Sequence, residues 1–246
     1  GVQYTISSIS VGGDLLFTEK DLIDEMSLKP GELFRFSRFR KDLDKLIDKY
    51  GDIGYAFVDV NPVTEYDDQQ GTAAIRYEIS KGMKVYFGEL SISGNSKTRD
   101  NVIRREFEIH DSQRYSGTGL RESKKNIERL GYFKQVQAIK ERDTDDPSIL
   151  NYTFKVEENR TGQLQAALGF QPGQSSSESN WFGQGRYSEE NQSGYGWKTG
   201  LQARWNGSKT YSFETNFTNP RVNDSFWLLG FTGFLQNDVR AITNDI

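Results

Sequence analysis

Residues 94–107 read GNSKTRDNVIRREF, and residues 127–136 read IERLGYFKQV; these two segments decide the fold. Gly94 begins a Gly-Asn turn that ends an apolar run. Thr98 follows at the position of a helix N-cap, and Gly131 ends a second helix because glycine enters the left-handed region without steric cost. Strand-forming residues flank the helices, so the pattern predicts a β-α-α-β-β unit. The apolar residues at helical spacing are Val102, Ile103, Phe107, Leu120, Ile127 and Leu130.

An earlier part of the chain repeats this pattern, about 80 residues before it. Thr18 precedes a helical pattern, Pro30 and Gly31 break it, and a second helix is expected from about Ser37. We therefore expect two small α+β domains in tandem. The positions that we assign as equivalent are Gly13 and Gly94, Thr18 and Thr98, Ile23 and Ile103, Ile47 and Ile127, and Gly54 and Gly131.

The composition changes near Arg160. Charged residues are frequent before it and sparse after it, and all 4 tryptophans lie in the later part. Such a shift marks a domain boundary, which we place near Thr161. The chain is thus expected to divide into a first domain of residues 1–81, a second of residues 82–160 and a third of residues 161–246.

The third domain alternates between apolar and polar residues with a period of two. Strands that alternate in this way, with aromatic residues near their ends, are typical of the wall of an outer-membrane barrel. A soluble β-sandwich also alternates, so the pattern alone leaves both architectures open. The alternating runs are Leu164–Phe170, Trp197–Trp205 and Tyr211–Phe217.

The composition argues against catalytic and nucleic-acid chemistry. The net charge of −4 has the wrong sign for a nucleic-acid surface. The chain has no cysteine, and His110 is its single histidine, so we expect no zinc or thiol site. Asp143, Asp145 and Asp146 lack the glycine and the distal glutamate of a calcium loop. The sequence therefore predicts neither an enzyme nor a bound metal or cofactor.

The segments VIRREF (102–107) and LGYF (130–133) resemble the POTRA (polypeptide-transport-associated) domains of the BamA-like family of outer-membrane assembly factors. The segment VEENRTG (156–162) resembles that family's junction between the last POTRA domain and the barrel, and TNP (218–220) its motif after an early barrel strand. The resemblance implies an α+β fold of tandem POTRA domains (β-α-α-β-β), followed by antiparallel β-strands of a truncated outer-membrane β-barrel. Because a membrane barrel must close and few strands precede Ile246, we interpret the chain as a fragment of a longer protein.

The resemblance also implies a location, a function and partners. The location is the outer membrane of a Gram-negative bacterium, with the POTRA domains in the periplasm. The function is to receive unfolded outer-membrane proteins by β-augmentation and to template their folding and insertion. The implied partners are these client proteins, lipoprotein subunits of an assembly complex and the lipid bilayer. Two alternatives are a two-partner secretion translocase built from POTRA domains and a barrel, and a soluble periplasmic polypeptide-binding module.

Three sets of site residues follow from the resemblance. The second strand of each POTRA domain is expected at a sheet edge, here Tyr55–Val63 and Phe133–Lys140, where it would bind clients. Asp111 takes the place of an acidic residue that contacts a lipoprotein. The first barrel strand forms the seam. Without a closing strand the barrel segment is either disordered or paired with a second copy of the chain, and we favour pairing. The client-binding residues are Tyr55, Phe57, Val58, Val60, Phe133, Val136, Ala138 and Ile139, and the seam residues are Leu164, Ala166, Leu168 and Phe170.

Overall fold

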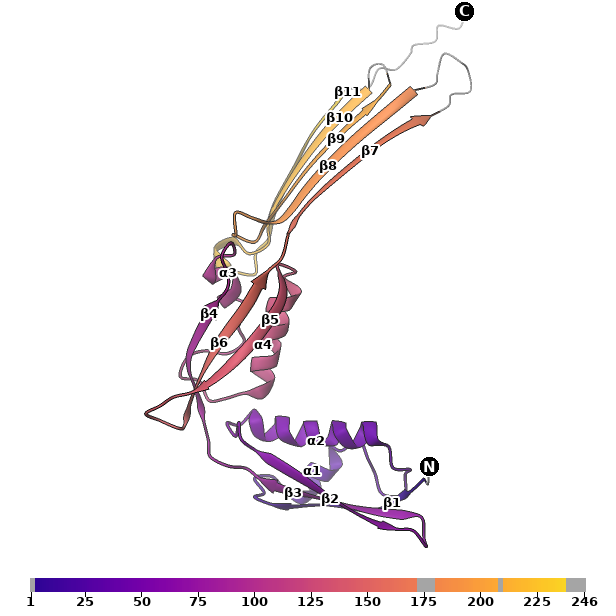
Figure 1. The fold of residues 1–246 in the computed structure, drawn as a ribbon, viewed down its shortest axis with the longest axis vertical. Helices are drawn as coiled ribbons and strands as arrows, with labels where there is room; N and C mark the ends of the chain where they lie inside the picture. The colour runs from indigo at the N-terminus through magenta and orange to yellow at the C-terminus, as the bar shows by residue number, and fades with distance from the viewer. Residues whose placement is uncertain (1–2, 172–179, 208–209, 238–246) are drawn as a thin grey trace, which may run out of the picture. The chain divides into compact units, whose positions relative to one another are not determined.

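A computed structural model describes residues 3–171, 180–207 and 210–237. Three sheets, two of them accompanied by helices, make up the described part of the chain (Figure 1). None of the helices in these ranges is both long and apolar enough to cross a membrane. The chain separates into two compact units, each described by itself. The first unit comprises Gly1–Ser91, Phe107–Lys125 and Ala138–Phe154, and the second Ile92–Glu106, Asn126–Gln137 and Lys155–Ile246.

The first repeat forms a three-stranded sheet, and α2 lies along it in Figure 1. The strands are arranged in the order β1-β3-β2, with β1 parallel and β2 antiparallel to β3. The last strand of the repeat therefore lies in the middle of the sheet, which leaves β1 and β2 at its edges. The elements are β1 (Thr5–Gly13), α1 (Glu19–Asp24), α2 (Phe36–Gly51), β2 (Asp59–Asp67) and β3 (Thr72–Ser80).

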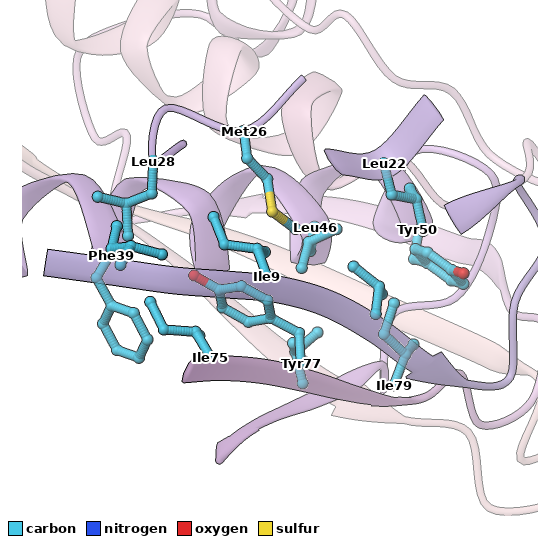
Figure 2. Close-up of a cluster of buried hydrophobic side chains, with 13 residues drawn as sticks. Ile9, Leu22, Met26, Leu28, Phe39, Leu46, Tyr50, Ile75, Tyr77 and Ile79 are labelled. Carbon is cyan, nitrogen blue, oxygen red and sulfur yellow. The ribbon is translucent and has the colours of Figure 1, made fainter. Parts of the chain in front are cut away.

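The core of the first repeat lies between the sheet and its helices (Figure 2). Ile75, Tyr77 and Ile79 alternate along β3, so their side chains share one face and are fully or almost fully buried. Leu46 and Tyr50 meet them from α2, four residues apart on one helical face. Burial of each such side chain contributes about 1.5–3 kcal/mol to folding.

The second repeat has the same architecture. Its strands are arranged in the order β4-β6-β5, so the last strand again lies in the middle. Phe87, Ile103, Ile127 and Phe154 are fully or almost fully buried in it. The predicted tandem of β-α-α-β-β domains is confirmed. The elements are β4 (Tyr86–Ser93), α3 (Asp100–Arg104), α4 (Gly117–Arg129), β5 (Phe133–Arg142) and β6 (Ile149–Glu158).

Gly13 and Gly94 occupy equivalent positions at the ends of β1 and β4. Their φ angles are +90° and +87°, a conformation that side chains disfavour. A Cβ atom would also lie 2.2 Å from the carbonyl oxygen of Ile79 in one repeat and 2.1 Å from that of Val156 in the other. Only glycine fits at this turn, because the backbone of the central strand passes against it.

The helices show that our sequence alignment of the repeats is wrong by one residue. The offset that matches the two glycines pairs Leu46 with Ile127, and both are buried. The residue that the sequence pattern assigns to this position, Ile47, is 40% exposed. The first helices show the same error, because Leu22, not its neighbour, corresponds to the buried Ile103. Adjacent helical residues point about 100° apart, so a shift of one residue exchanges a core position for a surface position.

The expected N-cap of α3 is also wrong. Arg99 is the N-cap residue, and its side chain makes no capping bond. Thr98 is instead buried, and its hydroxyl donates to Glu158 Oε2 at 3.1 Å. In the first repeat, Thr18 caps α1 as expected by accepting a hydrogen bond from the N–H of Asp21.

The third domain contributes a five-stranded antiparallel sheet with the order β11-β10-β9-β8-β7. Leu164 lies opposite Tyr187, which lies opposite Leu201, so one face is apolar. Arg186 lies opposite Gln202 on the other face. The predicted alternation is therefore confirmed. The elements are β7 (Gly162–Gln171), β8 (Asn180–Gln192), β9 (Trp197–Asn206), β10 (Thr210–Asn219), a short 3-10 helix η1 (Val222–Asp224) and β11 (Leu229–Asn237).

Candidate functional site

One edge of the first sheet is covered by the chain's own backbone. Residues 31–34, between α1 and α2, run beside the start of β1. The N–H of Ile6 donates to the carbonyl oxygen of Glu32, and the N–H of Gly31 donates to that of Ile6, both at 2.8 Å. The N–H of Phe34 donates to the carbonyl oxygen of Tyr4, also at 2.8 Å. This pairing occupies the outer side of β1 at its start, up to Ile6, on the edge opposite β2.

The second sheet is covered in the same way. Residues 112–115 run beside the start of β4. The N–H of Phe87 donates to the carbonyl oxygen of Gln113 at 2.8 Å, and the N–H of Ser112 donates to that of Phe87 at 2.9 Å. The N–H of Tyr115 donates to the carbonyl oxygen of Val85 at 3.1 Å. In the described part of the two three-stranded sheets, β2 and β5 form the opposite edges, and they pair with β3 and β6.

The expected client-binding residues that lie in β2 and β5 differ in how deeply their side chains are buried. Phe133 and Val136 lie in β5 with their side chains in the core, Ala138 is half-buried and Ile139 is exposed. Val60 lies in β2 and is buried. Side chains from one face of each strand therefore fix it to its own domain, and the backbone is the group that each edge can offer to another chain.

The expected start of the strand at Tyr55 is wrong, because β2 begins at Asp59. The N–H of Tyr55 donates to the carbonyl oxygen of Tyr50 at 3.1 Å, and the N–H of Val58 donates to that of Tyr55 at 3.2 Å. These bonds form a turn after α2 rather than a strand. Tyr55, Phe57 and Val58 are consequently not part of an edge strand.

Phe57 instead lies against the other expected edge. Lys140 Nζ lies 5.0 Å from the centroid of the Phe57 ring, and Arg142 Cζ lies 4.5 Å from it. Both cations come from the far end of β5, and such contacts with an aromatic face are attractive. Phe57 therefore packs on side chains at the far end of β5, away from the stretch that begins at Phe133.

Asp111 lies on the surface, in the loop before α4. Its Oδ1 accepts a hydrogen bond from the N–H of Leu90 at 3.0 Å. One carboxylate oxygen thus fastens the loop to β4, which gives Asp111 a structural role beside the expected contact with a lipoprotein.

The expected seam residues lie on β7, which is an edge of the five-stranded sheet in the described part of the chain. Leu164 and Leu168 are 80% and 86% exposed, and Phe170 is half exposed. Ala166 lies opposite Gly185 of β8, so this part of the seam has little side chain with which to hold its neighbour.

A buried polar network in the second unit escaped the sequence analysis. Asn191 is fully buried; its Nδ2 donates to Thr98 Oγ1 and its Oδ1 accepts from the N–H of Gly196, both at 2.8 Å. Glu189 Oε1 accepts from the N–H of Asn191 at 3.0 Å and from Lys97 Nζ at 3.3 Å. These hydrogen bonds join the turn before α3 to the turn between β8 and β9. The only sequence signal was the cluster of glycines at 194–196, which indicates a turn without naming its partner.

Two aromatic residues extend this junction. Arg99 Cζ lies 3.6 Å above the centroid of the Tyr195 ring. The backbone N–H of Arg99 donates to the carbonyl oxygen of Gly194 at 3.0 Å. The Tyr132 hydroxyl donates to the carbonyl oxygen of Gly196 at 3.4 Å, and burial raises the pKa of this phenol above its usual range. Searching the described residues yields no cluster of three or more acidic or histidine side chains that could hold a metal ion.

Residues 4–82 and 85–159 each match the POTRA family, described as "Surface antigen variable number repeat". Over 245 residues the chain is 32% identical to an outer membrane protein assembly factor BamA from Nitratidesulfovibrio vulgaris, a match that covers 97% of this chain and 30% of that protein. A BamA from Neisseria meningitidis is 30% identical over 173 residues, covering 69% of this chain and 22% of that protein. The chain thus spans less than a third of the length of these relatives.

Solved structures agree on the fold. A BamA from Haemophilus ducreyi lacking POTRA domains 1–3 superposes with a TM-score of 0.79 at 21% identity, covering 95% of this chain and 43% of that one. The POTRA domains 3–5 of Haemophilus influenzae BamA give a TM-score of 0.57 at 24% identity, covering 63% and 61%. The first of these matches favours the barrel over the sandwich for the third domain. The location expected from the sequence, the outer membrane with periplasmic POTRA domains, agrees with the relatives. The chain therefore belongs to the POTRA family, as two tandem domains that lead into the first strands of a BamA-like barrel.

Proposed function

We propose that the protein to which this chain belongs receives unfolded outer-membrane proteins in the periplasm, by β-augmentation along the outer edges of β2 and β5. The observation that carries the proposal is the asymmetry of each POTRA sheet. One edge is paired at its start with residues 31–34 or 112–115, and the other edge pairs only inward among the described residues. An extended client segment would complete the unpaired backbone groups of the open edge.

The two open edges are not equivalent. Pro62 lies within β2 and has no N–H, so the outer side of β2 cannot offer a continuous row of donors. No proline interrupts β5, although Lys140 and Arg142 lie near its far end under Phe57. We therefore assign the main client-binding role to the first part of β5.

We further propose that β7 templates the folding of the client in the membrane. β7 pairs with β8 on one side, and in the described residues no strand covers its other side. Ala166, Ala167 and Gly169 are poor strand formers, so a partner strand on this side would be held by backbone bonds rather than by side-chain packing. Such a seam exchanges strands at low cost.

Photo-crosslinking in the full-length protein tests the edge assignment. A crosslinking amino acid at Gln137 on β5 is expected to capture an unfolded barrel client, and one at Glu65 on β2 to capture it more weakly. Tyr86 is an exposed position in the covered stretch of β4, opposite Arg114, and we expect no adduct there. Equal capture at Tyr86 and Gln137 would show that edge pairing does not select the site.

The fate of the client separates this function from the two alternatives. An assembly factor leaves its client as a folded barrel in the membrane, whereas a two-partner secretion translocase releases it outside. A soluble binding module would hold the client without either outcome. Reconstituted full-length protein supplied with a barrel client and with a secreted β-helical client is expected to fold only the first into the bilayer.

A further inference from the structure

The connection between β10 and β11 carries a row of exposed large apolar side chains. Phe226 is 91% exposed and Trp227 79% exposed, and Leu228 and Leu229 follow them. Four consecutive side chains of this kind are unusual on a surface that faces water. The connection lies in the second compact unit.

The row continues the apolar face of the five-stranded sheet. Leu229 begins β11 opposite Asn219, and two residues further Phe231 lies opposite Phe217. These two rings stack with their centroids 5.4 Å apart, and Trp197 of β9 packs edge-on against Phe217 at 5.5 Å. The aromatic side chains thus form a band across β9, β10 and β11 at the end of the sheet next to this connection, which is the arrangement of a barrel's interfacial girdle.

The connection is held in shape by its own hydrogen bonds. The N–H of Val222 donates to the carbonyl oxygen of Trp227 at 2.9 Å, and the N–H of Trp227 donates to Ser225 Oγ at 3.2 Å. Asn223 and Asp224 between them hold positive φ angles of 52° and 57°. These bonds define the shape of the loop that carries Phe226 and Trp227.

Ion pairs join the connection between β10 and β11 to the residues that follow α3. Asp224 Oδ1 lies 3.1 Å from Arg105 Nη1, and the Arg105 side chain is only 8% exposed. Arg221 Nη2 lies 3.5 Å from Glu106 Oε1, while its guanidinium also lies 4.4 Å above the Phe226 ring. The polar residues of the connection therefore contact the last POTRA domain, while the apolar residues beside them stay largely exposed.

We propose that Phe226, Trp227 and Leu228 form an anchor that inserts into the periplasmic leaflet of the outer membrane. Tryptophan and phenylalanine favour the boundary between head groups and acyl chains, and Arg221 beside them can meet a lipid phosphate. The anchor would hold α3 at the membrane surface through the ion pair between Asp224 and Arg105. It depends on the membrane location of the barrel and not on client binding at β5.

Fluorescence quenching in the full-length protein tests this anchor. The described chain contains no cysteine, so Trp227→Cys, with any cysteine outside this chain replaced, gives a single site for an environment-sensitive dye. The protein is reconstituted in vesicles of phosphatidylethanolamine and phosphatidylglycerol that carry a nitroxide at a shallow or a deep acyl position. Phe36→Cys is the matched control, because Phe36 is an exposed phenylalanine of the first POTRA domain.

We expect dye at position 227 to emit at shorter wavelength than dye at position 36 and to lose most of its emission to the shallow nitroxide. Quenching by the deep nitroxide should be weaker, and position 36 should not respond to either. Dye at Phe226→Cys should behave like dye at position 227. A blue shift without quenching would mean that another protein segment covers the tip, and no shift would mean that it remains in water; either result overturns the proposal.

Discussion

Two fully buried tyrosines of the first POTRA domain differ in the partners of their hydroxyl groups. Tyr50 donates to the carbonyl oxygen of Asp14 at 3.2 Å and accepts from the N–H of Leu16 at 3.1 Å. The Tyr77 hydroxyl has no hydrogen-bond partner among the described residues. Because an unsatisfied buried hydroxyl costs about 1–3 kcal/mol, Tyr77→Phe should leave the free energy of unfolding unchanged or raise it, and Tyr50→Phe should lower it by about 1 kcal/mol. Hydrogen exchange of the β3 amides measures both.

The same pair gives a pH prediction. Burial, and then the negative charge of Asp42, raise the pKa of Tyr77 above its usual range. The folded state therefore keeps a proton that the unfolded state loses near pH 10, so stability is full below about pH 10 and declines as the pH rises further. Tyr77→Phe should reduce this alkaline decline in the exchange of β3 amides. An unchanged alkaline profile in Tyr77→Phe would assign the decline to other groups.

Two substitutions of Asp111 can distinguish its structural hydrogen bond from the predicted contact with a lipoprotein. We predict that a lipoprotein subunit contacts its carboxylate, which also accepts the N–H of Leu90. Asp111→Asn keeps an oxygen for this bond and removes the charge, so it should weaken co-purification of the lipoprotein while leaving the domain folded. Charge reversal with Asp111→Lys should weaken it further. Co-purification equal to the unaltered protein in both variants would leave only the structural role.

At the scale of elements, equivalent helices in the two repeats are fastened by different groups. Asp42 of α2 is fully buried and accepts the backbone N–H groups of Ser27 and Leu28. Ser123, at the same offset in α4, accepts the N–H of Glu108 at 2.7 Å and donates to the carbonyl oxygen of Gly119 at 2.7 Å. Each link ties the second helix to the segment that follows the first.

We expect the two links to contribute unequally to the free energy of unfolding of their repeats. Asp42→Ala leaves two N–H groups without a charged acceptor, and a hydrogen bond to a charged group contributes about 1.5–3 kcal/mol, so we expect a loss of several kcal/mol. Ser123→Ala removes neutral bonds that contribute about 0.5–1.5 kcal/mol each. Urea unfolding monitored by hydrogen exchange in each repeat compares them. If Ser123→Ala destabilises its repeat more than Asp42→Ala does, the charge of the acceptor is not what decides the strength of the link.

At the scale of the molecule, the five-stranded sheet presents an apolar face and two outer strands, β7 and β11. We predict that the 246-residue chain self-associates in water, because pairing of edges and apolar faces removes both from solvent. Light scattering over a dilution series should show this association without detergent, and detergent should reduce it. A chain ending at Arg160 should stay monomeric. The prediction fails if the longer chain is monomeric at every concentration while amides of β7–β11 are protected from exchange.

Local patterns in the sequence determined the type and order of the elements. The spacing of Leu120 and Ile127 marks a helix because it repeats within one segment, and the alternation of Tyr211 to Phe217 marks a strand for the same reason. Gly94 and Gly131 marked turns because their positive φ angles are a property of one residue and its neighbours. Composition located the start of the barrel strands beside Gly162, where β7 begins.

Only the tertiary structure decided which groups meet. Thr98 has the local pattern of a cap, yet a bond to Asn191, far along the chain, determines its role. Phe57 has the composition of a strand residue, yet it lies in a turn against β5. The sequence likewise did not show that loop backbone pairs with the start of β1 and of β4. Backbone pairing and side-chain partners depend on segments distant in sequence, and a local period carries no information about them.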